Sequence, residues 1–82
     1  MMELYQFASC PYCQKVIRGM KSFGLEENKD FQLIEASRGT PGRATVEKLG
    51  GLSQVPFLVD GSVKMYESDD ILTYLEKKYK KS

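Results

Sequence analysis

The sequence Ser9-Cys10-Pro11-Tyr12-Cys13 holds both cysteines of the chain and lies between two segments of different pattern. Residues 4–7, directly before it, form a short and largely apolar run, as in a buried strand. The segment after it has apolar residues at helical spacing. A helix that begins at Pro11 places Cys10 at its positive end, where free backbone N–H groups point toward the sulfur. Because this setting stabilises a thiolate, we expect Cys10 to be a nucleophile at neutral pH.

The spacing of the two cysteines favours a redox pair, because Cys13 lies one helical turn after Cys10 and can close a small disulfide ring with it. A zinc site needs further ligands, and the chain has two cysteines and no histidine, so we expect no metal site within one chain. A structural disulfide across so short a loop stabilises little. The lack of histidine also excludes a protease-type dyad of Cys and His. The alternative is an inert pair, or a pair that bridges a metal between chains.

Length and charge limit the classes of function. A chain of 82 residues fits one small domain, residues 1–82, with a limited core. Twelve basic against eleven acidic residues give a net charge of +1, which argues against broad binding of nucleic acid or of an anionic membrane. The N-terminus lacks a basic and apolar leader, and no window is long and apolar enough for a membrane span. Two closely spaced cysteines indicate a reducing compartment, so we expect a cytoplasmic protein whose partner is a small molecule or another protein.

The first half of the chain predicts a strand, a helix and a second strand. Residues 3–7 are the first strand, and the helix runs from Pro11 to about Gly24, which is its expected C-terminal cap. Residues 31–35 are the second strand, so the two strands are expected to be parallel and joined by a right-handed crossover. The buried face of the helix is predicted from apolar residues at helical spacing, namely Val16, Ile17, Met20 and Phe23.

The second half predicts a helix, a β-hairpin and a last helix. Thr40-Pro41 indicates an N-cap followed by proline, which opens a short helix that stops at Gly50-Gly51. Residues 55–59 and 62–66 are the predicted strands of the hairpin, with a turn at Asp60-Gly61. Ser68 is the expected cap of the last helix. That helix has an acidic first turn and a basic last turn, which suits its dipole; the residues are Asp69 and Asp70, and then Lys77, Lys78, Lys80 and Lys81.

The predicted elements follow the order β-α-β-α-β-β-α. The motif Cys10-Pro11-Tyr12-Cys13 lies at the first helix and Val55-Pro56 at the third strand. With this order and these motifs, the chain resembles a dithiol glutaredoxin of the thioredoxin superfamily. The resemblance covers essentially the whole length. It implies an α/β, thioredoxin-like fold with a four-stranded mixed sheet flanked by three helices. Val55-Pro56 is similar to the cis-proline element of that family, and Ser68-Asp69-Asp70 to the turn that meets the γ-glutamyl end of glutathione.

Two positions depart from the glutaredoxin pattern. Tyr66-Glu67 stands where glutaredoxins usually have Gly-Gly, and Phe7 where many have a lysine. By contrast, Gln54-Val55-Pro56 and Glu67-Ser68-Asp69 are similar to the glutathione-binding half of glutathione transferases, and no second, all-helical domain of that family follows here. We therefore expect a stand-alone glutaredoxin whose ligand contacts resemble those of a transferase.

The resemblance implies a glutathione-dependent thiol–disulfide oxidoreductase that acts on oxidised or glutathionylated proteins. Glutathione is then a co-substrate, with no permanently bound cofactor, and the protein is expected to be a monomer that binds neither nucleic acid nor membrane. Cys10 is the implied nucleophile and Cys13 the resolving thiol. The implied glutathione contacts come from three parts of the chain, and they are Tyr12, Gln54, Val55, Pro56, Glu67 and Ser68.

Each implied contact has a plainer interpretation. Val55 pairs its backbone with the cysteinyl unit of the ligand, or Pro56 simply begins an edge strand. Glu67 holds the ligand's ammonium, and Ser68 takes a carboxylate or is only an N-cap. Lys15 and Arg43 assist a second carboxylate, or are solvated helix residues.

Other functions use the same residues. One is a reductase for a dedicated partner, fed by another thiol or by a flavoprotein. Another is an iron–sulfur carrier in which two chains and two glutathiones share a cluster through Cys10. The last is a binding module derived from a transferase half, for which an inert Cys10 is expected.

Overall fold

The computed structural model describes residues 1–79 of the 82-residue chain. Its elements follow the predicted order, and they are β1 (Met2–Gln6), α1 (Pro11–Ser22), β2 (Phe31–Glu35), α2 (Pro41–Gly50), β3 (Phe57–Asp60), β4 (Val63–Met65) and α3 (Ser68–Tyr79). Lys77 and Lys78 lie in the last turn of α3, as predicted, and Lys80 and Lys81 lie outside the described residues. None of the helices within residues 1–79 is long and apolar enough to span a membrane.

The strands form one mixed sheet in the order β2-β1-β3-β4. β1 is parallel to β2, with Leu4 opposite Leu33, and antiparallel to β3, with Leu4 opposite Leu58. β3 and β4 form the predicted antiparallel hairpin. The four-stranded sheet with three helices confirms the predicted α/β, thioredoxin-like fold. Since β3 is an inner strand, the interpretation of Pro56 as the start of an edge strand is wrong.

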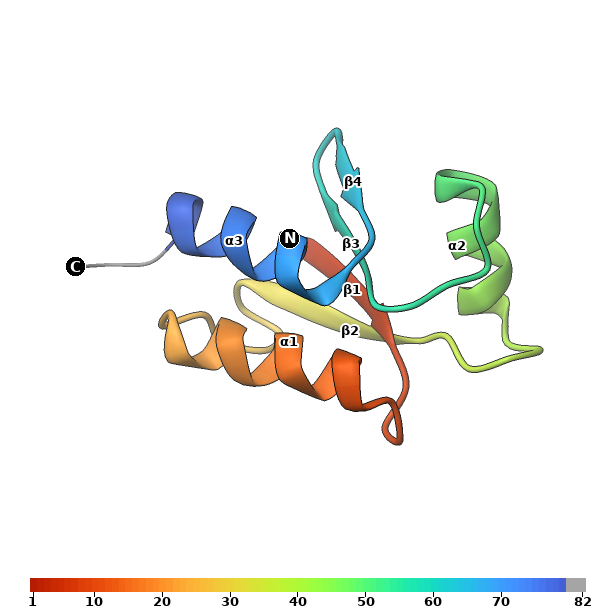
Figure 1. Cartoon of the computed structure of the whole chain (residues 1–82), viewed down its shortest axis with the longest axis horizontal. Coiled ribbons are helices and arrows are strands. Elements are labelled where there is room, and N and C mark those ends of the chain that lie inside the picture. The colour runs from red at the N-terminus through yellow and green to blue at the C-terminus, as the bar shows by residue number, and fades with distance from the viewer. Residues whose placement is uncertain (80–82) are drawn as a thin grey trace.

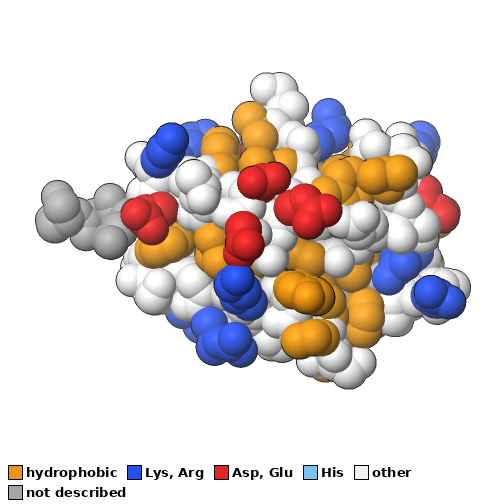
Figure 2. Space-filling view, in the orientation of Figure 1, with side chains coloured by type: hydrophobic (Ala, Val, Ile, Leu, Met, Phe, Trp, Pro, Cys, Tyr) orange, Lys and Arg blue, Asp and Glu red, His pale blue; other side chains and the backbone are white. Residues whose placement is uncertain are grey.

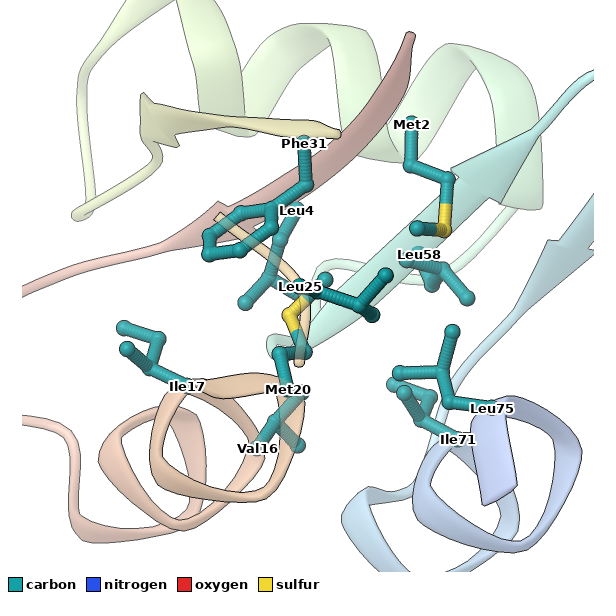
Figure 3. Packing of buried hydrophobic residues seen from close by; sticks show 10 residues of the cluster. All are labelled: Met2, Leu4, Val16, Ile17, Met20, Leu25, Phe31, Leu58, Ile71 and Leu75. Carbon is teal, nitrogen blue, oxygen red and sulfur yellow. The ribbon is translucent and has the colours of Figure 1, made fainter. Parts of the chain in front are cut away.

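The helices cover the two faces of the sheet unequally. Figure 1 shows α1 and α3 side by side on one face, while α2 lies apart from them. Because side chains alternate along a strand, Leu4 and Leu58 face α1 and α3, and their neighbours Tyr5 and Phe57 belong to a second cluster with Val46 of α2. The larger cluster is drawn in Figure 3 and consists of Met2, Leu4, Val16, Ile17, Met20, Leu25, Phe31, Leu58, Ile71 and Leu75.

Two glycines allow close packing of the helices. A Cβ on Gly19 of α1 would overlap the side chain of Leu72, so the small residue lets α1 and α3 approach each other. A Cβ on Gly42 would overlap the carbonyl oxygen of Glu35, so the first turn of α2 rests against the end of β2. These contacts set how closely α1 packs on α3 and how closely α2 packs on the end of β2, and the candidate site lies near the starts of α1 and α3.

Hydrogen bonds to the carboxylate of Asp60 connect the C-terminal half of α3 to the hairpin. Asp60, the last residue of β3, accepts hydrogen bonds at Oδ2 from the hydroxyls of Tyr74 (2.6 Å) and Tyr79 (2.7 Å) and from Lys78 Nζ (3.1 Å). Burial on its own raises the pKa of this carboxyl, but the hydrogen bonds outweigh burial and hold the pKa of Asp60 below its usual value. The ionised form therefore stabilises the fold.

Several element boundaries differ from the predictions by one or two residues; β1 is Met2–Gln6 and β4 is Val63–Met65, for example. α1 ends at Ser22, and Gly24, with φ of +88°, turns the chain so that the Leu25 N–H donates to the Met20 carbonyl at 3.1 Å. β3 begins at Phe57, since the two residues predicted to precede it in the strand lie in a loop. Ser68 is the first residue of α3 and not its cap, because the Ile71 N–H donates to the carbonyl of residue 67 at 2.9 Å.

Candidate functional site

Cys10 lies at the N-cap position of α1, as the sequence predicts. Its backbone is extended (φ −85°, ψ 112°), Pro11 follows as the first helical residue, and Cys10 Sγ accepts a hydrogen bond from the Cys13 N–H at 3.2 Å. The carbonyl of Phe7 holds the preceding turn by accepting from the Cys10 N–H at 3.1 Å. The sulfur of Cys10 is therefore directed at the first turn of the helix, where it accepts one of the N–H groups that lack a partner within the helix.

The two cysteines are free thiols in different surroundings. Cys10 keeps 6% of its surface exposed, whereas Cys13 is fully buried. Burial, and then a hydrogen bond to Cys10, raise the pKa of the Cys13 thiol to about 12. Cys13 therefore stays protonated at neutral pH. Both cysteines are buried, and Cys10 is the more exposed of the two.

A hollow of about 450 Å³ adjoins the start of α1, and we call it the Tyr12 hollow. Its walls come from the start of α1, the loop before β3 and the start of α3, and they are Tyr12, Gln54, Val55, Glu67, Ser68 and Asp69. Five of the six residues predicted to contact glutathione thus line one hollow. The sixth, Pro56, is buried behind the lining, and the bond between Val55 and Pro56 is cis, as the resemblance implies.

Glu67 is held in an unusual backbone conformation at this hollow. Its φ is +69°, in the left-handed region that costs a non-glycine residue on the order of 1 kcal/mol. The side-chain amide of Gln54 donates from Nε2 to Glu67 Oε1 at 2.9 Å. Residues separated by thirteen positions therefore meet across the Tyr12 hollow, and the carboxylate of Glu67 keeps further capacity to accept hydrogen bonds.

Asp69 also lines the hollow and was not among the predicted site residues. Its Oδ1 lies 2.6 Å from Lys15 Nζ, so an exposed ion pair joins α1 to α3 at the rim. Figure 2 shows acidic side chains gathered near the start of α3, with basic side chains beside them and hydrophobic side chains over the adjoining end of α1. Lys15 is exposed, in agreement with its interpretation as a solvated helix residue, and it pairs with Asp69.

A second hollow, of about 440 Å³, lies along α2, and we call it the Arg43 hollow; it is lined by Arg38, Gly39, Thr40, Arg43, Ala44, Glu47 and Ser53. Arg43 is half-buried and donates from Nε to the Ala36 carbonyl at 2.8 Å and from Nη1 to Ser53 Oγ at 3.2 Å. It is therefore anchored, and not a freely solvated helix residue. Ser53 lines this hollow, and its chain neighbour Gln54 lines the Tyr12 hollow.

Comparison with known proteins agrees with this arrangement. The sequence profile described as "Glutathione S-transferase, N-terminal domain" matches residues 4–82. The chain belongs to this family. The transferase side of the predicted resemblance is confirmed by this match, together with membership of the thioredoxin-like superfamily, and the specific glutaredoxin assignment stays a prediction.

Solved glutathione transferases share the fold over the whole chain. A delta-class glutathione transferase of Nilaparvata lugens is 26% identical with a TM-score of 0.82, and the match covers 100% of this chain and 38% of that one. Human glutathione S-transferase T1-1 is 27% identical with a TM-score of 0.81, covering 100% of this chain and 34% of that one. An epsilon-class enzyme of the housefly, Musca domestica, at 20% identity and a TM-score of 0.84, supports the fold alone. The chain therefore spans little more than a third of these transferases.

Proposed function

We propose that residues 1–82 form a single domain that acts as a glutathione-dependent thiol–disulfide oxidoreductase, reducing glutathione mixed disulfides and protein disulfides. The observation that carries the proposal is the arrangement of the two free thiols at the start of α1. Cys10 Sγ accepts the Cys13 N–H, and Cys13 is buried and protonated. Tyr12, which lies between them in the chain, lines the Tyr12 hollow. One cysteine is thus suited to attack and the other to resolve.

In the first step, the Cys10 thiolate attacks the glutathione sulfur of a mixed disulfide. A disulfide bond forms between Cys10 and glutathione, and the bond between glutathione and the other thiol breaks. That thiol leaves as a thiolate and takes a proton from solvent. A second glutathione thiolate then attacks the glutathione sulfur on Cys10, which yields glutathione disulfide and restores the Cys10 thiolate.

Protein disulfides take a second route that needs Cys13. Cys10 first forms a mixed disulfide with the protein substrate, and Cys13 then loses its proton and attacks Cys10, which releases the reduced protein and leaves a bond between the two cysteines. Two glutathiones reduce this bond and become glutathione disulfide. The raised pKa of Cys13 supports the order of events, because Cys13 does not compete as the first nucleophile at neutral pH.

The Tyr12 hollow suits the γ-glutamyl and cysteinyl parts of glutathione. Its volume of about 450 Å³ falls in the usual range for small-molecule sites. The carboxylate of Glu67 is suited to the ammonium group, and Ser68 with the start of α3 to the neighbouring carboxylate. Val55 lies outside β3, and its backbone makes no hydrogen bond to another backbone group among residues 1–79, so it is free to pair with the cysteinyl unit.

The Arg43 hollow suits the glycyl end of the same ligand. Arg38 and Arg43 line it, and both guanidinium groups attract a carboxylate. Ser53 lines this hollow and its chain neighbour Gln54 lines the Tyr12 hollow, which supports the proposal that one extended ligand contacts both. The two hollows together offer opposite charges to the ammonium and carboxylate groups of glutathione.

The test is NADPH-coupled reduction of a glutathione mixed disulfide in the presence of glutathione and glutathione reductase. We expect Cys10→Ser to abolish activity and Cys13→Ser to retain reduction of the mixed disulfide while losing most reduction of a protein disulfide. The matched pair of cysteine variants controls for general effects of removing a thiol. Loss of both activities in folded Cys13→Ser, or full activity in Cys10→Ser, would contradict the proposal.

A second candidate function is favoured by the family match: the chain supplies the glutathione-binding part of an enzyme that conjugates glutathione to electrophiles. Conjugation to an electrophilic chloronitrobenzene, followed by absorbance, separates the two candidates. Conjugation that survives Cys10→Ser, without any disulfide reduction by the wild type, would favour this second function.

A further inference from the structure

The segment between α2 and β3 forms one wall of both hollows yet has no regular structure of its own. Residues 51–56 belong to no helix or strand. They include Ser53 of the Arg43 hollow and Gln54 and Val55 of the Tyr12 hollow. Leu52, directly before them, is 56% exposed, so hydrophobic burial of its side chain does not fix the segment. Its position therefore depends on contacts from another part of the chain.

Arg43 Nη1 donates to Ser53 Oγ in this segment, and Tyr66 holds the preceding residue, Leu52, through its hydroxyl group. The Leu52 N–H donates to Tyr66 Oη at 3.1 Å, and Tyr66 Oη donates to the Leu52 carbonyl at 2.8 Å. The Val46 carbonyl in α2 is a weaker acceptor at 3.4 Å. One side chain thus pairs with both backbone groups of Leu52, as a strand partner does, although the two residues are fourteen positions apart.

The ring of Tyr66 is itself fixed. Its centroid lies 4.7 Å from that of Phe57 at 42°, and Phe57 packs on Tyr5 in the smaller core cluster. A Cβ on Gly50 would overlap the hydroxyl and ring of Tyr66, so the glycine leaves room for the ring at the end of α2. A rigid aromatic side chain therefore connects the core to the irregular segment.

We propose that Tyr66 is a positioning residue for the glutathione site, a proposal that rests on the proposed function. Tyr66 fixes the position of the segment that carries Gln54 and Val55, on one side of the Tyr12 hollow. As the chain neighbour of Glu67, it also fixes the position of the opposite side. The 2.9 Å hydrogen bond from Gln54 to Glu67 joins the two sides. Tyr66 lines neither hollow, so it acts through these residues and does not touch the ligand.

The test is the full chain with Tyr66→Phe, which keeps the ring and removes the hydroxyl. We expect KM for a glutathione mixed disulfide to rise about three- to tenfold, as for one lost hydrogen bond, with kcat changed less than about twofold. The stoichiometric reaction of Cys10 with a small aromatic disulfide that lacks glutathione is expected to keep its rate. Amide hydrogen exchange at Leu52 should accelerate in the same variant.

Tyr79→Phe is the matched control, because it removes a tyrosine hydroxyl from Asp60 at the far end of α3. It is expected to lower stability and to leave KM unchanged. An equal rise of KM in both variants would overturn the proposal, since the effect would then follow general stability. An unchanged KM in Tyr66→Phe would overturn it as well.

The two proposals fail in different ways. If the wild type reduces no glutathione mixed disulfide, the proposed function fails, and NMR of the ligand-free chain still decides the role of Tyr66. The side-chain amide resonances of Gln54 must shift in Tyr66→Phe and not in Tyr79→Phe. Unchanged Gln54 resonances would show that Tyr66 does not position the site.

Discussion

The carboxylates that lie near the two ends of α3 differ in how many hydrogen bonds they accept from the protein. At the C-terminal half, Asp60 accepts from two tyrosine hydroxyls and one lysine, and its side chain is only 15% exposed. At the N-terminal end, Glu67 accepts from the side chain of Gln54, and Asp69 is 81% exposed. Oδ2 of the first carboxylate accepts from three donors of the protein itself, whereas the second group keeps acceptor capacity that faces a hollow.

This difference separates a structural contact from a binding site on one helix. A carboxylate surrounded by internal donors stabilises the fold and has little left to offer a ligand. A carboxylate with open acceptor positions contributes less to folding, and its hydrogen-bonding capacity is available to a cationic group. Substitutions at the two ends should therefore change different measured quantities.

The largest expected effect is on KM and comes from Glu67, at the N-terminal end of α3. Glu67→Gln keeps the shape of the side chain and removes its charge, so we expect KM for the glutathione mixed disulfide to rise about tenfold or more, as for loss of a charge-assisted hydrogen bond. Steady-state kinetics measure KM, and urea unfolding should show a free energy within about 0.5 kcal/mol of the wild type. Lost stability with an unchanged KM would reverse the roles assigned to the two ends.

The next largest effect is on stability and comes from Asp60, near the C-terminal half of α3. Asp60→Asn removes the charge that three donors share, so we expect the free energy of unfolding at pH 7 to fall by about 1–2 kcal/mol, with KM unchanged. Since the folded-state pKa of Asp60 is lowered, its stabilisation is present above the unfolded-state pKa of about 3.9 and is lost as pH falls through the folded-state value. Urea unfolding at neutral and at acidic pH should therefore show a smaller acid loss in Asp60→Asn than in the wild type.

The smallest effect concerns the exposed ion pair. Lys15→Met breaks the contact with Asp69, and because both side chains are exposed we expect a stability change below about 1 kcal/mol that vanishes in high salt. The variant leaves a free carboxylate at the rim of the Tyr12 hollow, so KM should rise slightly at low salt. Asp69→Asn is the matched control and should not raise KM. A stability loss as large as that of Asp60→Asn would show that the rim is also structural.

Local rules were sufficient for the parts of the site that lie within one turn of the chain. The start of α1 at Pro11 and that of α2 after Thr40 follow from capping chemistry, which needs only near neighbours. The predicted start of β3 was wrong because the continuous apolar run 55–59 is typical of a strand led by proline, although Val55 lines a hollow. An apolar run alone does not show where the strand begins.

Contacts between distant segments could not be predicted from pattern. Lys15 and Asp69 are 54 positions apart, and their pairing depends on the close approach of α1 and α3 at Gly19. Tyr66 looked like a departure from a family pattern, and its hydrogen bonds to Leu52 appear only once the hairpin and α2 are placed. The sequence shows which groups are present, and packing decides which of them meet.

The position of β1 inside the sheet has a consequence for biosynthesis. The strand before the cysteines pairs with β3, and the core cluster that joins β1, α1 and α3 includes Leu58, Ile71 and Leu75. On a growing chain, therefore, both thiols leave the ribosome well before β3 and α3, on which β1 and α1 pack. Until residues 57–75 have been made, both cysteines are open to oxidants, and the burial of Cys13 is completed only when those residues pack.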